Sequence, residues 1–181
     1  SNPKKDVGIL CANYIESKSS EFLKIGISFG TTIYEFVQNA KYLDTNFKQI
    51  IPLMGGVEMK NDYLHSNFLC YELSSKYSCK VNFFYAPAFA ESVEQKQTLM
   101  DSNLVKQAIE EARSVDVGII GVGNPLKNST YKNLGYLSKD NIAELKKANV
   151  VGDICASFFD RKGKEVDCKF SETSIGLRLS D

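Results

Sequence analysis

The chain has 181 residues, of which 43% are hydrophobic and 24% are charged, a composition typical of a single globular α/β domain. Basic and acidic residues number 22 each, so the chain lacks the net positive charge with which a domain attracts DNA by itself. No apolar stretch reaches the roughly 20 residues of a membrane span, and the five cysteines contain no Cys-x-x-Cys pair, which argues against zinc and disulfide sites and favours a cytoplasmic location.

A strand, a glycine-rich turn and a helix are predicted first. The apolar run 22–28 predicts the strand, and apolar residues at helical spacing over 33–40 predict the helix. Thr32 followed by Glu35 is a capping-box pattern. We therefore expect the helix to begin at the turn, with Thr32 as its cap.

Further strands and helices alternate along the chain. Three more apolar runs have the length of buried strands: 50–54, 81–85 and 115–122. Helical spacing is found over 64–71, over 101–114 and in a short stretch that begins at Ser138. In the first of these helices we expect Leu64, Phe68 and Tyr71 to form the buried face.

This alternation predicts an α/β fold with a Rossmann-like, mostly parallel sheet flanked by helices. After Gly152 the pattern changes to an apolar run over 154–159, a turn over 160–163 and a strand over 175–179, which predicts a small antiparallel addition near the C-terminus. No linker or internal repeat interrupts the sequence, so we expect one domain over residues 1–181.

Three glycine-bearing turns follow predicted strands, at 30–32, 55–56 and 121–123. Ligands of such sheets bind where the carboxyl ends of the strands meet the next helices, so we expect the three turns to share one rim. The turn of Gly30, Thr31 and Thr32 would offer free backbone N–H groups and a helix dipole to a phosphate or carboxylate. The alternative is a plain strand-to-helix connection with a threonine cap.

The sequence offers little support for catalysis. It has no Gly-x-Ser-x-Gly motif and no cluster with metal-ligand spacing, and its single histidine, His65, has no acid or nucleophile in its motif. Asp153 and Glu91 are candidate bases, but each is equally suited to accept hydrogen bonds from sugar hydroxyls. We predict no catalytic residue, no metal and no cofactor.

Several motifs occur in an order that resembles a known family. They are GISFGTT at 26–32, PLMGG at 52–56, HSN at 65–67, YAPA at 85–88 with Glu91-Ser92, VDVGIIGVG at 115–123, LGYL at 134–137, and VGD at 151–153 with FFD at 158–160 and Gly163. From about Leu23 onward the chain resembles the effector-binding domain of SorC-type sugar-responsive transcription regulators. The resemblance implies a fold like that of the phosphosugar isomerases and deaminases, and a phosphorylated sugar as effector.

The resemblance also implies a set of ligand-binding residues. Gly30, Thr31 and Thr32 would hold the phosphate, and Ser28 belongs to the same turn. Gly55 and Gly123 would line the pocket, and Asp153 would accept hydrogen bonds from ligand hydroxyls. The family implies a homodimer or tetramer, and operator DNA would be bound only through a helix-turn-helix outside this chain.

The chain departs from the family pattern at three places. No helix-turn-helix precedes residue 22, and the family's domain continues past the position of Asp181 into a Gly-Gly segment and a lysine-bearing helix that contributes to the ligand site. Ser171 and Thr173 stand where family members often have asparagine and arginine. Loss of that guanidinium removes a bidentate partner for a second anionic group.

Two other functions remain open at the level of sequence. One is a phosphosugar isomerase or deaminase of the same fold, which would need a general base beside the reacting carbon. The other is a domain that mainly assembles subunits and has lost its ligand.

Overall fold

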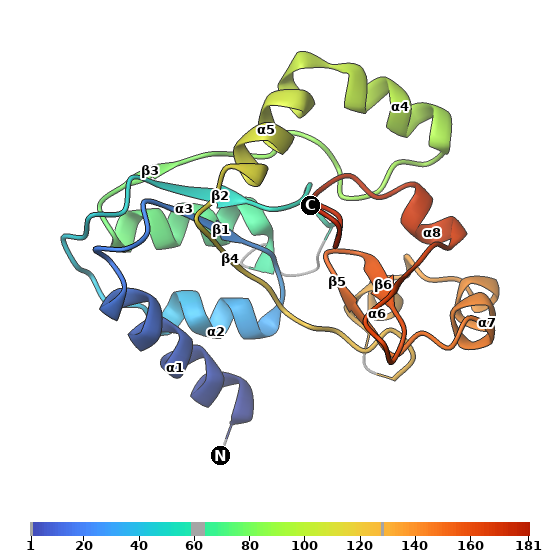
Figure 1. Ribbon diagram of the computed structural model, residues 1–181, viewed down its shortest axis with the longest axis horizontal. Helices are drawn as coiled ribbons and strands as arrows, with labels where there is room; N and C mark the ends of the chain where they lie inside the picture. The colour runs from blue at the N-terminus through green and yellow to red at the C-terminus, as the bar shows by residue number, and fades with distance from the viewer. Residues whose placement is uncertain (1, 59–63, 128) are drawn as a thin grey trace.

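A four-stranded parallel sheet forms the centre of the molecule (Figure 1). The computed structural model describes residues 2–58, 64–127 and 129–181. The strands lie in the order β3-β2-β1-β4 and comprise β1 Lys24–Ile27, β2 Gln49–Pro52, β3 Lys80–Val81 and β4 Val117–Ile119. All three pairings are parallel, which confirms the predicted Rossmann-like sheet.

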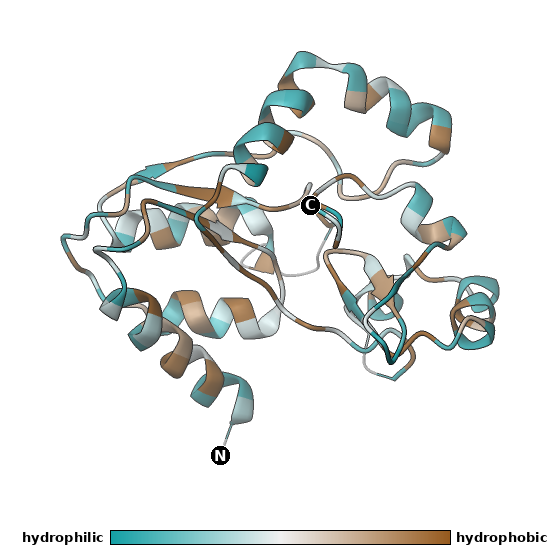
Figure 2. Ribbon diagram, in the orientation of Figure 1, coloured by the Kyte–Doolittle hydropathy of each residue, from teal (hydrophilic) through white to brown (hydrophobic). Residues whose placement is uncertain are grey.

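Helices cover both faces of this sheet. Helices α1 Pro3–Ser17, α2 Thr31–Asn39 and α3 Ser66–Lys76 share one hydrophobic cluster with Ile25 and Ile27. On the other face Ala112 of α5 Asn103–Arg113 packs with Ile51 and Leu53. The strands are apolar in Figure 2, whereas α4 Val93–Asp101 is largely hydrophilic and buries no residue.

Helix α1 lies in a region for which the sequence analysis predicted no element. Asn2 caps it by accepting a hydrogen bond from the Lys5 N–H, and Pro3 occupies its first turn. It runs parallel to α2, since Lys4 contacts Thr31 at one end and the Glu16 carboxylate accepts from the Lys41 N–H at the other. Between these ends Gly8 packs so closely on α2 that an added Cβ would lie 2.6 Å from the Glu35 carbonyl carbon.

A second, three-stranded antiparallel sheet follows, in the order β5-β6-β7. It consists of β5 Gly152–Ile154, β6 Ser157–Phe159 and β7 Glu165–Val166, and it packs with α6 Thr130–Asn133, α7 Lys139–Lys147 and α8 Lys169–Glu172. The predicted antiparallel addition is therefore confirmed, but the run 154–159 contains a hairpin turn rather than one strand. Residues 175–179 form no strand, and instead Gly176 makes an isolated antiparallel bridge to Met54.

Two further predictions were wrong in detail. The buried face of α3 is formed by Leu69, Cys70 and Leu73, whereas Phe68 and Tyr71 are exposed. The predicted strand 115–122 is shorter, because β4 pairs with β1 alone and this pairing covers only Val117–Ile119. In contrast, the helical spacing over 101–114 corresponds to α5, on which Val105, Ile109 and Ala112 are buried.

No helix among the residues that the structure describes has both the length and the apolar character needed to cross a bilayer.

Candidate functional site

A cavity of about 280 Å³ opens where the carboxyl ends of β1 and β4 meet the beginning of α2. It is lined by residues 28–33, 121–124 and 129–131, together with Lys4, Asp153 and Cys155. This volume lies near the lower end of the ~300–1,000 Å³ range of small-molecule sites. The cavity is at the edge of the parallel sheet where ligands of such folds bind.

The beginning of α2 forms one wall. Gly30 is the N-cap, with φ of 121°, a conformation that favours glycine, and as glycine it supplies no side-chain cap. The predicted capping box of Thr32 and Glu35 is therefore wrong, because the N-cap is Gly30 and Thr32 already lies inside the first turn of the helix. The N–H groups of the first turn have no partner within the helix, so they face the cavity mouth as anion donors.

The wall beside it is the junction of β1 and β4. The buried Ser28 N–H donates to the Ile119 carbonyl at 3.1 Å, and its hydroxyl accepts from the Gly121 N–H at 3.3 Å. These bonds continue the pairing of the two strands past their ends. They hold the turns 28–32 and 121–123 at a fixed separation.

Asp153 of β5 also lines the cavity. Its backbone exchanges hydrogen bonds with that of Gly123, at 2.9 Å and 3.2 Å, so the two sheets meet here. An added Cβ at Gly123 would overlap the Asp153 carboxylate, so any larger residue here would displace that side chain. The side chain is only 6% exposed, and no residue in the described ranges donates a hydrogen bond to its carboxylate. Burial raises the pKa of Asp153 to about 6.

The turn that follows Asp153 is strained. Cys155 and Ala156 join β5 to β6 with φ of 47° and 63°, a left-handed conformation that is unusual for residues other than glycine. Burial, with a smaller contribution from the Asp153 charge, raises the pKa of Cys155 to about 12. Its thiol is therefore neutral near pH 7 and a poor nucleophile.

The structure gathers six of the predicted ligand residues around this one cavity: Ser28, Gly30, Thr31, Thr32, Gly123 and Asp153. Gly55 is the exception, because it lies buried against the carbonyls of Ala86 and Pro87 and does not line the cavity. The expected convergence of three glycine turns on one rim thus holds for two of them. Glu91, the other candidate base, is also not among the described lining residues.

Sequence reasoning missed Lys4 and Tyr131, which both line the cavity. The pair Asn2-Pro3 was a usable signal for the first, because asparagine at the N-cap followed by proline is typical of a helix start. No comparable signal marks Tyr131, which reaches the cavity through tertiary packing against Phe29. Within the described ranges, no three His, Cys, Asp or Glu side chains are grouped closely enough to hold a metal ion.

Comparison with known proteins gives a consistent result. The family model described as "Putative sugar-binding domain" matches residues 1–181. Among curated proteins, the deoxyribonucleoside regulator of Bacillus subtilis is 24% identical over 94% of this chain and 54% of its own length. The sorbitol operon regulator of Klebsiella pneumoniae is 25% identical over 86% of this chain and 50% of its own length. The chain thus spans about half the length of these relatives.

Solved structures agree with this match. A DeoR family transcriptional regulator from Listeria monocytogenes superposes with a TM-score of 0.89 at 34% identity, covering 98% of this chain and 69% of that one. The full-length sorbitol operon regulator SorC from Klebsiella pneumoniae superposes with a TM-score of 0.90 at 23% identity, covering 99% of this chain and 60% of that one.

Proposed function

Because the chain belongs to the sugar-binding domain family of SorC-type and DeoR-type transcription regulators, we propose that it senses an effector that regulates carbohydrate metabolism. We propose further that the effector is a phosphorylated sugar or a related metabolite. Binding would shift an equilibrium between two states of the regulator that differ in affinity for operator DNA. The DNA itself would be held by another part of the regulator, since this chain carries no net charge.

One observation carries the proposal: the same cavity is lined by groups that suit an anion and by a group that suits hydroxyl donors. The first turn of α2 offers backbone N–H groups and the hydroxyls of Thr31 and Thr32, which suit a phosphate. The Asp153 carboxylate lines the same cavity, buried and without a donor among the described residues, which suits sugar hydroxyls. A phosphosugar has an anion at one end and hydroxyl donors along the rest.

The isomerase or deaminase alternative gains no support. The matched relatives are transcription regulators. In the cavity, Asp153 is the one carboxylate among the described lining residues, and the neutral Cys155 thiol beside it has no paired base. The site therefore favours binding without turnover.

The binding prediction is tested by thermal unfolding with a panel of sugar phosphates and their unphosphorylated counterparts. The panel contains glucose 6-phosphate, fructose 6-phosphate, fructose 1,6-bisphosphate, ribose 5-phosphate, 2-deoxyribose 5-phosphate and sorbitol 6-phosphate. At about 100 times Kd a ligand stabilises by about 2.7 kcal/mol, which corresponds to about 5–10 °C in Tm for a domain of this size. We expect a shift of this order with a phosphorylated member only.

The double variant Thr31→Val, Thr32→Val is expected to weaken binding of that ligand by at least tenfold. Each lost hydrogen bond to a charged group is worth about 1.5–3 kcal/mol. Thr98→Val on the exposed helix α4 is the matched control and should bind as the parent does. Undiminished binding by the double variant would show that the phosphate is not held by the Thr31 and Thr32 hydroxyls. Failure of every phosphorylated member to stabilise the parent would favour the assembly function, and turnover of one of them would favour the enzyme.

Self-association is the remaining part of the proposal. Val7, Leu10 and Tyr14 lie at helical spacing on α1 and are 53%, 69% and 58% exposed, so they form an apolar stripe turned away from α2. We expect the chain to sediment as a dimer or tetramer at micromolar concentration. Leu10→Glu should lower that assembly state if the stripe takes part, with Lys5→Glu at an exposed position of the same helix as control. A monomer at high concentration would contradict this expectation.

A further inference from the structure

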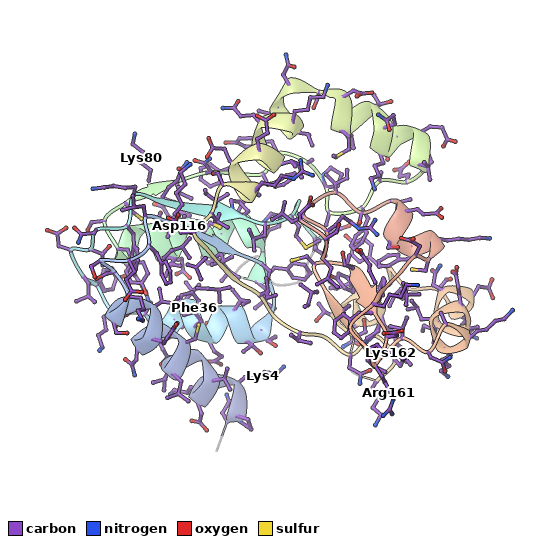
Figure 3. All side chains as sticks on the ribbon, viewed as in Figure 1. Lys4, Phe36, Lys80, Asp116, Arg161 and Lys162 are labelled. Atoms are coloured by element: carbon purple, nitrogen blue, oxygen red, sulfur yellow. The ribbon has the colours of Figure 1, made fainter. Side chains whose placement is uncertain are left out.

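Lys4 connects the first helix to the candidate effector site. Its Nζ donates to Thr31 Oγ1 at 2.7 Å, and its side chain lines the cavity. Figure 3 shows Lys4 reaching from the first turn of α1 toward the end of α2 at which that helix begins. Of the described lining residues, Lys4 is the one with a cationic side chain.

The packing of the two helices explains this position. Because α1 and α2 are parallel and in close backbone contact at Gly8, their N-termini lie side by side. Two helix N-termini and one ammonium thus put positive charge into the same small volume. No ion pair among the described residues includes Lys4, so a carboxylate does not neutralise it there.

We propose that Lys4 binds the phosphate group of the effector and thereby fastens the first turn of α1 to the occupied site. This inference rests on the proposed function. In the ligand-free state the ammonium donates to the Thr31 hydroxyl. With ligand bound, the ammonium donates to a phosphate oxygen instead, and the freed hydroxyl donates to the same phosphate.

The contact makes the position of α1 depend on occupancy. A hydrogen bond from the ammonium to a charged phosphate is stronger than the hydrogen bond to the neutral Thr31 hydroxyl that it replaces. The helix that supplies the ammonium is therefore held more firmly when ligand is present, which is the differential contact that allosteric coupling requires. In a longer protein with a domain ahead of α1, this contact would lie next to the junction.

The experiment compares Lys4→Met with Lys5→Met, which removes the same charge from the same helical turn. Lys5 is exposed and does not line the cavity. Affinity for the sugar phosphate that most stabilises the parent is measured by titration calorimetry. We expect Lys4→Met to weaken binding by tenfold or more, Lys4→Arg to retain affinity within about threefold, and Lys5→Met to match the parent.

Hydrogen exchange supplies a second readout. On addition of the same ligand, the exchange rates of the amides of residues 5–8 should fall in the parent and in Lys5→Met. In Lys4→Met these rates should not change. Unfolding of the ligand-free variants serves as the folding control, because the Lys4 side chain is exposed and its loss should leave Tm nearly unchanged.

The outcomes separate the two claims. If the parent binds a sugar phosphate and Lys4→Met binds it equally well, the role of Lys4 is overturned and the proposed function stands. If both methionine variants lose affinity equally, general charge attraction explains the effect and the role of Lys4 is again overturned. If the parent binds no sugar phosphate at all, the proposed function fails and this inference fails with it.

Discussion

Asp153→Asn is expected to stabilise the ligand-free domain at pH 7.5 while weakening effector binding. Burial raises the pKa of the Asp153 carboxyl from 3.8 to about 6, so its ionised form is unfavourable in the folded state. At about 1.36 kcal/mol per pKa unit, removing the charge should raise the free energy of unfolding by about 2–3 kcal/mol. This combination is typical of a side chain kept for function at the expense of stability.

The Asp153 carboxyl should also make the free energy of unfolding depend on pH. Between pH 3.8 and about 6 the folded state of the parent binds more protons than the unfolded state does. The free energy of unfolding therefore falls as the pH rises through this window, and the loss is complete above it. In Asp153→Asn this decline should be absent. The variant should therefore have a higher free energy of unfolding than the parent at pH 7.5, but not at pH 3.5.

Denaturant unfolding at the two pH values measures the effect, with the exposed Asp140→Asn on α7 as the control. Binding of the best sugar phosphate to Asp153→Asn should weaken about 10- to 100-fold, since hydrogen bonds to a charged acceptor contribute about 1.5–3 kcal/mol each. An equal destabilisation at both pH values would show that the carboxylate has a structural partner. Unchanged affinity would remove Asp153 from the ligand site.

Gly55→Ala is expected to destabilise the domain by about 3 kcal/mol or more, at the upper end of the range for overpacked cores. An added Cβ would lie 2.6 Å from the Pro87 carbonyl carbon and 2.7 Å from the Ala86 oxygen. The two segments cannot separate easily, because the Gly56 N–H donates to the Ala86 carbonyl at 2.9 Å and the Ala88 N–H donates to the Gly56 carbonyl at 2.7 Å. Thermal unfolding should show a loss of about 6–12 °C.

Gly121→Ala is the matched control, because an added Cβ there meets no atom within 4 Å. Its Tm should stay close to that of the parent. A Gly55→Ala protein as stable as the parent would contradict the close packing described here. The affinity of the folded fraction of Gly55→Ala for the effector gives a second result. An unchanged Kd agrees with the position of Gly55 outside the cavity. Loss of binding would indicate that Gly55 belongs to the ligand site.

Local sequence patterns predicted some elements well and others poorly, for physical reasons. The run 22–28 and the spacing over 33–40 identified β1 and α2, because both elements bury a regular apolar face. The spacing of Leu64, Phe68 and Tyr71 misled, because apolar residues lie on more than one face of α3 and periodicity alone does not choose which face is buried. The first helix escaped notice because its buried contacts include small residues such as Gly8 and Ala12.

By itself, the sequence determined the alternating α/β architecture, the glycine turn before α2 and the resemblance to SorC-type regulators, which the family match confirms. These features are local or lie in order along the chain. Only the tertiary structure decided which of the predicted residues share a cavity, because Gly55 and Gly123 follow strands in the same way and differ only in their long-range neighbours. It also brought Lys4 to Thr31, across 27 positions of sequence, through the parallel packing of two helices that no short-range pattern encodes.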